Sequence, residues 1–272
     1  MAGLLTCLKH MMFARQADTA GLSRSCRTQS GLRAMSRGGS RNLAIVVAGV
    51  MAILTGESGR AGEPVMALTG LNSAFVQTFD SFEGTFGSLP TGFSVSKDGG
   101  NVMGEGDGDF RGISRGNVTA GGCYAWAVGE TNRALGYQPT ADEFTPGFFQ
   151  LAISNATDRP VRYVAVSYIV VWQNNADRSS SLELFFSSDG AALEPVSGSL
   201  FVTPGPKAEC SKWSSREFEF TICLECPLRP GGIIRLRWLG DDSGGSGSRD
   251  EYGLDRVAIR AKASLGTVFC VF

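Results

Sequence analysis

The stretch VRYVAVSYIVVW, residues 161–172, decides the fold class of this 272-residue chain. Most of its residues are β-branched or aromatic, and apolar side chains fall on both faces of an extended chain. Such residues favour strands, and a strand that is apolar on both faces belongs in the middle of a sheet. The sequence therefore predicts a central β-strand at 161–172.

Shorter stretches on both sides of this strand alternate apolar and polar residues, as half-buried strands do. These stretches are residues 75–79, 92–96, 123–128, 148–153, 182–186, 218–222, 234–238 and 254–261. Clusters of Gly, Asp, Ser and Pro separate them, and no segment shows helical periodicity. We therefore expect an all-β fold over residues 74–262: an antiparallel β-sandwich of the jelly-roll type, concanavalin-like or carbohydrate-binding-module-like. The Gly-rich stretch 100–122 is expected to be irregular.

The first 61 residues are typical of a targeting segment. A basic region precedes residues 43–56, which carry no charge and are too few for a membrane span of about 20 residues. This pattern predicts a secretory signal that is cleaved near Ala61, or nearer Ala67. An uncleaved signal anchor, an organellar transit peptide and a start at Met35 instead of Met1 are the alternatives. Residues 62–73 would be a linker and 263–272 a tail, leaving no membrane span after cleavage.

Charge and histidine content exclude several functions for the exported chain. Residues 1–61 hold 8 of the 25 Lys and Arg and 2 of the 26 Asp and Glu, which leaves 17 basic and 24 acidic residues, a net charge of −7. Nucleic-acid binding requires a positive surface, so we expect none. The only histidine, His10, lies in the targeting segment. Residues 62–272 therefore cannot form a Ser-His or Cys-His catalytic pair or a zinc site with a histidine ligand.

Several landmarks resemble a family of secreted bacterial jelly-roll modules found in exosortase-sorted, PEP-CTERM-like surface proteins. These landmarks are residues 79–81 (FDS), 130–136 (ETNRALG), the strand 161–172, 185–190 (FFSSDG), 236–238 (LRW) and 253–259 (GLDRVAI). The resemblance covers about residues 74–262 and implies fold and export rather than an activity. The usual Pro-Glu-Pro sorting tail is missing from residues 263–272, ASLGTVFCVF.

Acidic residues near the last strand suggest a structural calcium site. If the first and last strands pair, Asp80 meets Asp255, with Asp241 and Asp242 in the adjacent loop together with Asp250 and Glu251. Calcium takes six to eight oxygen ligands, which such a cluster could supply. The alternatives are a solvated acidic loop, or an Asp255 satisfied by backbone amides or by an arginine.

Cysteines and tryptophans supply the other candidates. Cys223 and Cys226 form a CxxC motif, and export favours a disulfide of Cys210 with one of them over redox chemistry or zinc. Trp126 and Trp238 lie in alternating apolar runs and are expected in the core. Trp213 lies among polar residues, so we expect it in an exposed loop where it could stack on a sugar, and Trp172 could do the same.

These observations favour a secreted, noncatalytic β-sandwich that binds an extracellular polysaccharide or a cell-surface glycan. The alternatives are a glycoside hydrolase or polysaccharide lyase on the same fold, or a purely structural, adhesive surface protein. The enzyme alternative needs two carboxylates that face one groove. Glu183 and Glu219, at polar positions of their strands, are the candidates for it.

Overall fold

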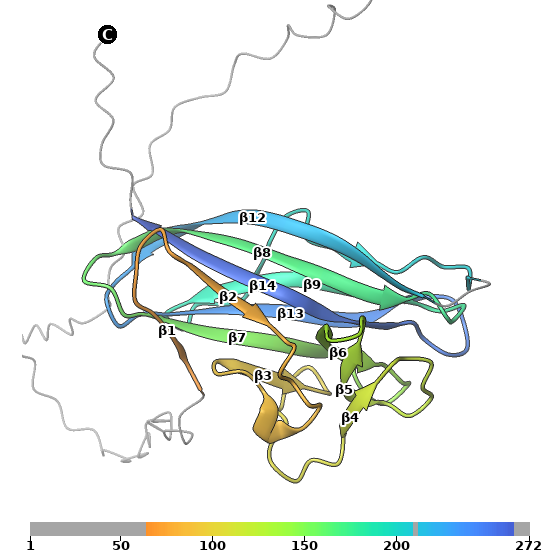
Figure 1. The fold of residues 1–272 in the computed structure, drawn as a ribbon. Helices are drawn as coiled ribbons and strands as arrows, with labels where there is room; N and C mark the ends of the chain where they lie inside the picture. The colour runs from red at the N-terminus through yellow and green to blue at the C-terminus, as the bar shows by residue number, and fades with distance from the viewer. Residues whose placement is uncertain (1–63, 209–211, 264–272) are drawn as a thin grey trace, which may run out of the picture. The chain divides into compact units, whose positions relative to one another are not determined.

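The computed structural model describes residues 64–208 and 212–263. Over these ranges the chain forms two β-sheets that lie one above the other (Figure 1). The same ranges contain one short 3-10 turn, η1 (Phe86–Ser88), and no helix long and apolar enough to cross a membrane. The predicted all-β sandwich is confirmed. Residues 1–61, the predicted targeting segment, lie outside the described residues.

Each sheet has seven strands within the described ranges. The first sheet has the order β1 (Met66–Leu68), β7 (Gly147–Asn155), β13 (Ile233–Gly244), β9 (Ser179–Ser188) and β10 (Glu194–Pro195), with β3 (Phe93–Ser96) also on β7 and β11 (Phe201–Val202) also on β9. The second has the order β12 (Trp213–Leu228), β8 (Val161–Gln173), β14 (Glu251–Ala263), β6 (Arg133–Gln138), β5 (Gly122–Ala127) and β4 (Phe110–Ser114), with β2 (Ala74–Thr78) also on β14. β1 is parallel to β7 and β4 to β5, whereas the other pairs are antiparallel.

The stretch 161–172 forms β8, which lies between β12 and β14 as predicted. Its alternate residues Val164, Val166, Tyr168 and Val170 point into the main core. On the opposite side, Ile169 and Val171 pack in a smaller cluster on the outer face of the second sheet. The outer face of β8 is therefore covered toward the end of the strand, whereas Tyr163 and Ala165 nearer its start are partly exposed.

Trp238 of β13 joins the two sheets in the core. Its side chain is fully buried, and its ring meets that of Tyr168 edge to face with centroids 5.5 Å apart. Burial of two such rings removes a large apolar area from water and stabilises the contact between the sheets.

The structure differs from the sequence prediction in its short and glycine-rich segments. The expected linker 62–73 contains β1, and the expected irregular stretch 100–122 contains β4. The strands β6, β10 and β11 were not predicted. These five strands have only two to six residues, so any alternation of apolar and polar residues is too short to identify them.

The outer-face cluster depends on two glycines. Trp126 of β5 is fully buried there, and its Nε1–H donates to the carbonyl of Tyr252 at 3.1 Å. Gly136 and Gly253 face each other across β6 and β14 beneath it. A Cβ on Gly136 would lie 2.0 Å from Trp126 Nε1 and 2.5 Å from the Tyr252 oxygen. The indole therefore fits only because residue 136 has no side chain.

We predict that Gly136→Ala lowers the free energy of unfolding by about 3 kcal/mol, because the indole must leave its place. Urea denaturation of the purified variant measures this loss. Gly87→Ala is the matched control, because a Cβ at Gly87 meets no atom within 4 Å. Equal midpoints for the two variants would contradict the packing described.

Candidate ligand-binding face

The predicted pairing of the first and last long strands is confirmed. β2 is antiparallel to β14, with Thr78 opposite Arg256. Asp255 is half-buried and accepts a hydrogen bond from Asn132 Nδ2 at 3.0 Å, while exposed Asp80 accepts the Arg133 N–H at 3.4 Å. Burial raises the pKa of Asp255, and the charge of Asp80 raises it further. The two carboxylates are therefore neighbours, as strand pairing predicts.

Asp241 and Asp242 do not join this pair. Both lie in β13 of the first sheet, opposite Ser181 and Ser180, rather than in a loop. Asp242 forms ion pairs with Arg178 and Arg249, which neutralise its charge. Within residues 64–208 and 212–263 no three Asp, Glu, Cys or His side chains are grouped to hold a metal ion. The four predicted ligands do not form one site, and calcium binding stays a prediction.

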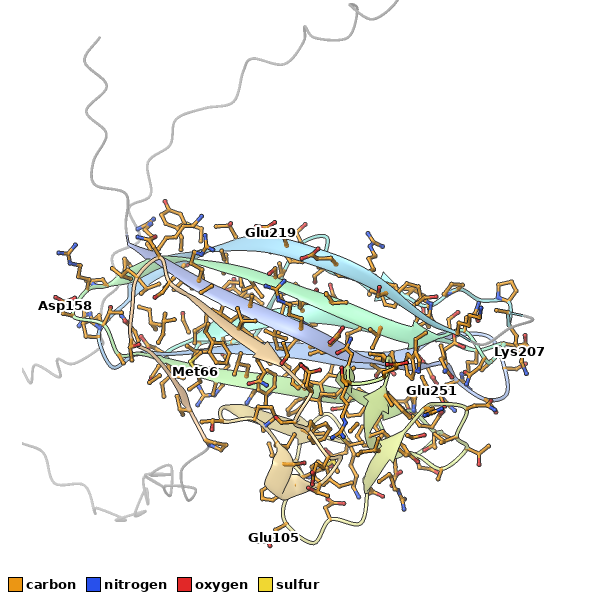
Figure 2. All side chains as sticks on the ribbon, viewed as in Figure 1. Met66, Glu105, Asp158, Lys207, Glu219 and Glu251 are labelled. Atoms are coloured by element: carbon orange, nitrogen blue, oxygen red, sulfur yellow. The ribbon has the colours of Figure 1, made fainter. Side chains whose placement is uncertain are left out.

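Asp250 and Glu251, predicted in the loop before the last strand with a solvated loop as the alternative, are fully buried. Asp250 Oδ1 accepts the Ala176 N–H at 3.0 Å. Glu251 accepts the Val118 N–H at 2.7 Å and the Asn175 side-chain amide at 2.8 Å. Burial raises the pKa of both carboxyls. These acids hold the loops that contain Val118 and Ala176 against the start of β14. Figure 2 shows Glu251 there, beside the β4–β6 part of the sheet.

The two tryptophans proposed for sugar stacking are part of the protein's packing. Trp213 is the first residue of β12, not a loop residue, and its ring centroid lies 5.5 Å from that of Trp126. Its Nε1–H donates to the Arg115 carbonyl at 3.1 Å. Trp172 packs against the main core, 4.8 Å from Phe201 between ring centroids. Their side chains are partly exposed, but each has a structural partner.

The structure excludes one of the two disulfides predicted for Cys210. Cys223 is free and exposed on β12, and Cys123 is free and buried. A Cys210–Cys223 disulfide is therefore not formed. Cys226 is not among the free thiols, and Cys210 lies outside the described residues. A disulfide between Cys210 and Cys226 stays a prediction.

The two glutamates of the enzyme alternative lie on different sheets. Glu183 is on β9 of the first sheet, and Glu219 is on β12 of the second. Their neighbours Leu184 and Phe218 point into the core between the sheets, so the glutamates project from opposite faces of the sandwich. Figure 2 shows Glu219 at the side of β12 away from the first sheet. They cannot share a groove.

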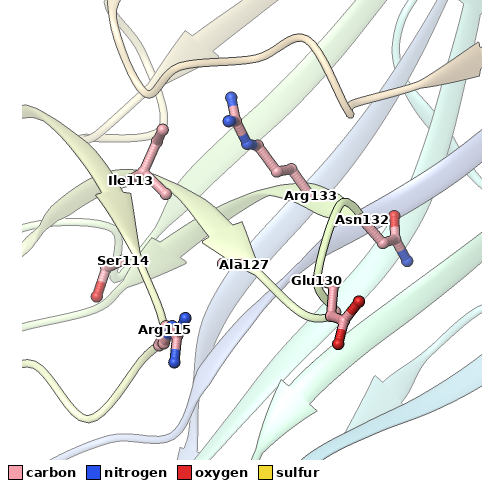
Figure 3. Close-up of a pocket in the computed structure, with 8 residues that line it drawn as sticks. Ile113, Ser114, Arg115, Ala127, Glu130, Asn132 and Arg133 are labelled. Atoms are coloured by element: carbon pink, nitrogen blue, oxygen red, sulfur yellow. The ribbon is translucent and has the colours of Figure 1, made fainter.

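One hollow of about 330 Å³ lies beside the β5–β6 hairpin (Figure 3). It is lined by Ile113, Ser114, Arg115, Ala127, Gly129, Glu130, Asn132 and Arg133. Arg133 Nη1 donates to the Phe82 carbonyl at 3.1 Å, which ties one wall to the neighbouring loop. The lining contains no aromatic ring, so it offers a sugar no flat apolar surface.

The outer face of the first sheet combines aromatic, cationic and amide groups. We call its residues Phe148 and Gln150 of β7, Arg235, Arg237 and Leu239 of β13, and Glu183 and Phe185 of β9 the arginine face. The strand register places Gln150, Arg237 and Phe185 in one row, and Phe148, Leu239 and Glu183 in the next. Their chain neighbours Phe149, Trp238 and Leu184 are core residues, so this set faces away from the core.

Arg237 is held rigidly at the centre of this face. Its guanidinium carbon lies 3.9 Å from the centroid of the Phe148 ring. Its Nε and Nη2 donate to Gln150 Oε1 at 3.0 and 2.7 Å. A cation stacked on a ring and bound to an amide loses little further freedom when it meets a ligand. Sequence reasoning missed this face, although Arg235, Arg237 and Leu239 occupy the outward positions of a strand whose inward positions are apolar.

No protein-family model matches the chain, and no curated protein matches it. Solved structures that are similar in part include the family 22 xylan-binding module from Paenibacillus barcinonensis, with 13% identity, a TM-score of 0.36, and 72% of this chain and 100% of that chain covered. A family 61 carbohydrate-binding module in complex with β-1,4-galactotriose has 14% identity and a TM-score of 0.34, with 68% of this chain and 94% of that chain covered. The K1 adhesin domain of Lys-gingipain from Porphyromonas gingivalis has 12% identity and a TM-score of 0.34, with 70% of this chain and 99% of that chain covered. At these TM-scores the likeness carries no argument about function.

We predict that Trp213→Ala lowers the free energy of unfolding by about 2 kcal/mol, because the indole loses its packing on Trp126 and its hydrogen bond. Urea denaturation measures the loss. Trp213→Phe keeps a ring but not the N–H, so its loss should be smaller. An unchanged stability of the alanine variant would show that Trp213 has no structural role.

Proposed function

We propose that this protein is a noncatalytic β-sandwich that binds a carbohydrate chain along the arginine face. The observation that carries the proposal is a guanidinium, that of Arg237, which is fixed by the Gln150 amide and the Phe148 ring. The strand register places the partly exposed Phe185 beside Arg237 on β9. Phe148 and Gln150 of β7 are buried and support Arg237 from below. A ligand would therefore lie over the partly exposed residues of β13 and β9.

The chemistry of the face suits a sugar. A sugar ring has an apolar face and a rim of hydroxyls that both donate and accept hydrogen bonds. Phe185 and Leu239 are partly exposed and supply apolar surface, Arg237 supplies donors, and Glu183 supplies an acceptor. Few convergent polar groups set among apolar ones are typical of binding sites that fix orientation.

The separation of Glu183 and Glu219 favours binding over cleavage by this pair. Glycoside hydrolysis uses two carboxyl groups no more than about 9.5 Å apart. Sheets of a sandwich are themselves about 10 Å apart, and these two side chains point away from each other on opposite faces.

The proposed setting is outside the cell, at an extracellular polysaccharide or a cell-surface glycan. The basic segment followed by the uncharged residues 43–56 supports export. A structural calcium ion at Asp80 and Asp255 and a disulfide at Cys226 belong to the same proposal, because both suit an exported protein. Neither is needed for the arginine face to bind.

We predict that Phe185→Ala weakens glycan binding at least about tenfold, because the sugar loses its apolar contact. A glycan array identifies the ligand, and affinity electrophoresis with that polysaccharide measures the change. Tyr163→Ala is the matched control, because Tyr163 is also a partly exposed aromatic residue, but it lies on the outer side of β8 in the second sheet.

Circular dichroism and thermal melting confirm that both variants are folded. Loss of binding in Tyr163→Ala with full binding in Phe185→Ala would move the site to the second sheet. A blank array with the folded wild-type protein would leave only the structural, adhesive alternative.

A further inference from the structure

We infer that the ligand of the arginine face is an acidic polysaccharide, whose carboxylates pair with Arg235 and Arg237. This inference rests on the proposed function and adds the ligand's chemical class. A guanidinium presents parallel N–H donors in a plane, which match the two oxygens of a carboxylate. A neutral sugar needs no such pair of cations.

The two arginines form a local positive pair on one strand. Arg235 and Arg237 are alternate residues of β13, so they project from the same side of the sheet with Cα atoms about 7 Å apart. Both are partly exposed. Their neighbours across β9 are uncharged, because Ser187 lies opposite Arg235 and Phe185 opposite Arg237. The row positions beside them on β7 are Ala152 and Gln150, which are also uncharged.

The acidic residues of the same face lie farther along the strands. Glu183 is opposite Leu239, and Asp241 is two residues beyond Leu239 on β13. The face is therefore cationic at 235–237 and anionic toward 241. This polarity is notable because residues 62–272 carry a net charge of −7. A carboxylate on the ligand would be attracted to Arg235 and Arg237 and repelled by Glu183 and Asp241, and this difference fixes where it binds on the face.

The geometry of Arg237 favours a charged partner over a hydroxyl. Stacking on Phe148 and hydrogen bonding to Gln150 hold its guanidinium in one orientation. Neither arginine lacks partners in the free protein, so binding is an exchange of partners. An ionised oxygen competes in that exchange better than a neutral one, since charge-assisted hydrogen bonds are about twice as strong.

The test compares polygalacturonate with its fully methyl-esterified form, which has the same backbone without the charges. Affinity electrophoresis of the full chain should show at least about tenfold tighter binding to polygalacturonate. Arg235→Gln should weaken binding to polygalacturonate about tenfold and weaken binding to the ester much less. Arg260→Gln is the matched control, because Arg260 is an exposed arginine on β14 of the second sheet.

The outcomes separate this inference from the proposed function. Equal affinity for the two polymers, or equal effects of Arg235→Gln and Arg260→Gln, would overturn the acidic ligand and leave carbohydrate binding in place. Binding to neutral glycans alone, weakened by Phe185→Ala, would also overturn it. Failure to bind any glycan would overturn the proposed function itself.

Discussion

The burial of Trp238 is the constraint on which the rest of the structure depends. This side chain is fully buried against Tyr168 of the opposite sheet and fixes which residues of β13 point inward. A slip of one residue would reverse every side chain of the strand. Arg235 and Arg237 would then enter an apolar core, where an unpaired charge costs several kcal/mol. The same contact that joins the sheets thus holds the two arginines on the outer surface.

The outer faces of the two sheets have different roles. On the second sheet, Tyr124, Trp126 and Val171 form a small buried cluster at one end, with Trp213 packed against it. The loop that contains Val118 is fastened there by Glu251. On the first sheet, Phe185 and the charged residues of the arginine face are partly exposed, whereas Phe148 is buried. Phe185 is therefore accessible on the outer face of the first sheet, whereas Trp126 has a structural role on that of the second.

The long strands could be predicted from sequence because their apolar alternation runs for many residues, as in β8 and β13. The site could not, because the function of an outward side chain depends on its neighbours in other strands. Trp213 occurs among polar residues, and only the approach of β5 shows that it packs on Trp126. Asp241 and Asp242 follow a glycine, which indicates a turn, but pairing with β9 extends the strand through them. The proximity of Asp80 and Asp255 was predictable because the pairing of β2 with β14 determines it.

We propose that the ligand binds on the outer face of the first sheet. Methyl NMR spectra of the full chain, recorded during titration with the glycan identified on the array, test it most directly. Leu239 lies in the arginine face, and Ile169 lies on the outer side of β8 in the second sheet. We expect the Leu239 methyl signals to shift while those of Ile169 stay in place. Shifts at Ile169 with Leu239 unchanged would contradict it.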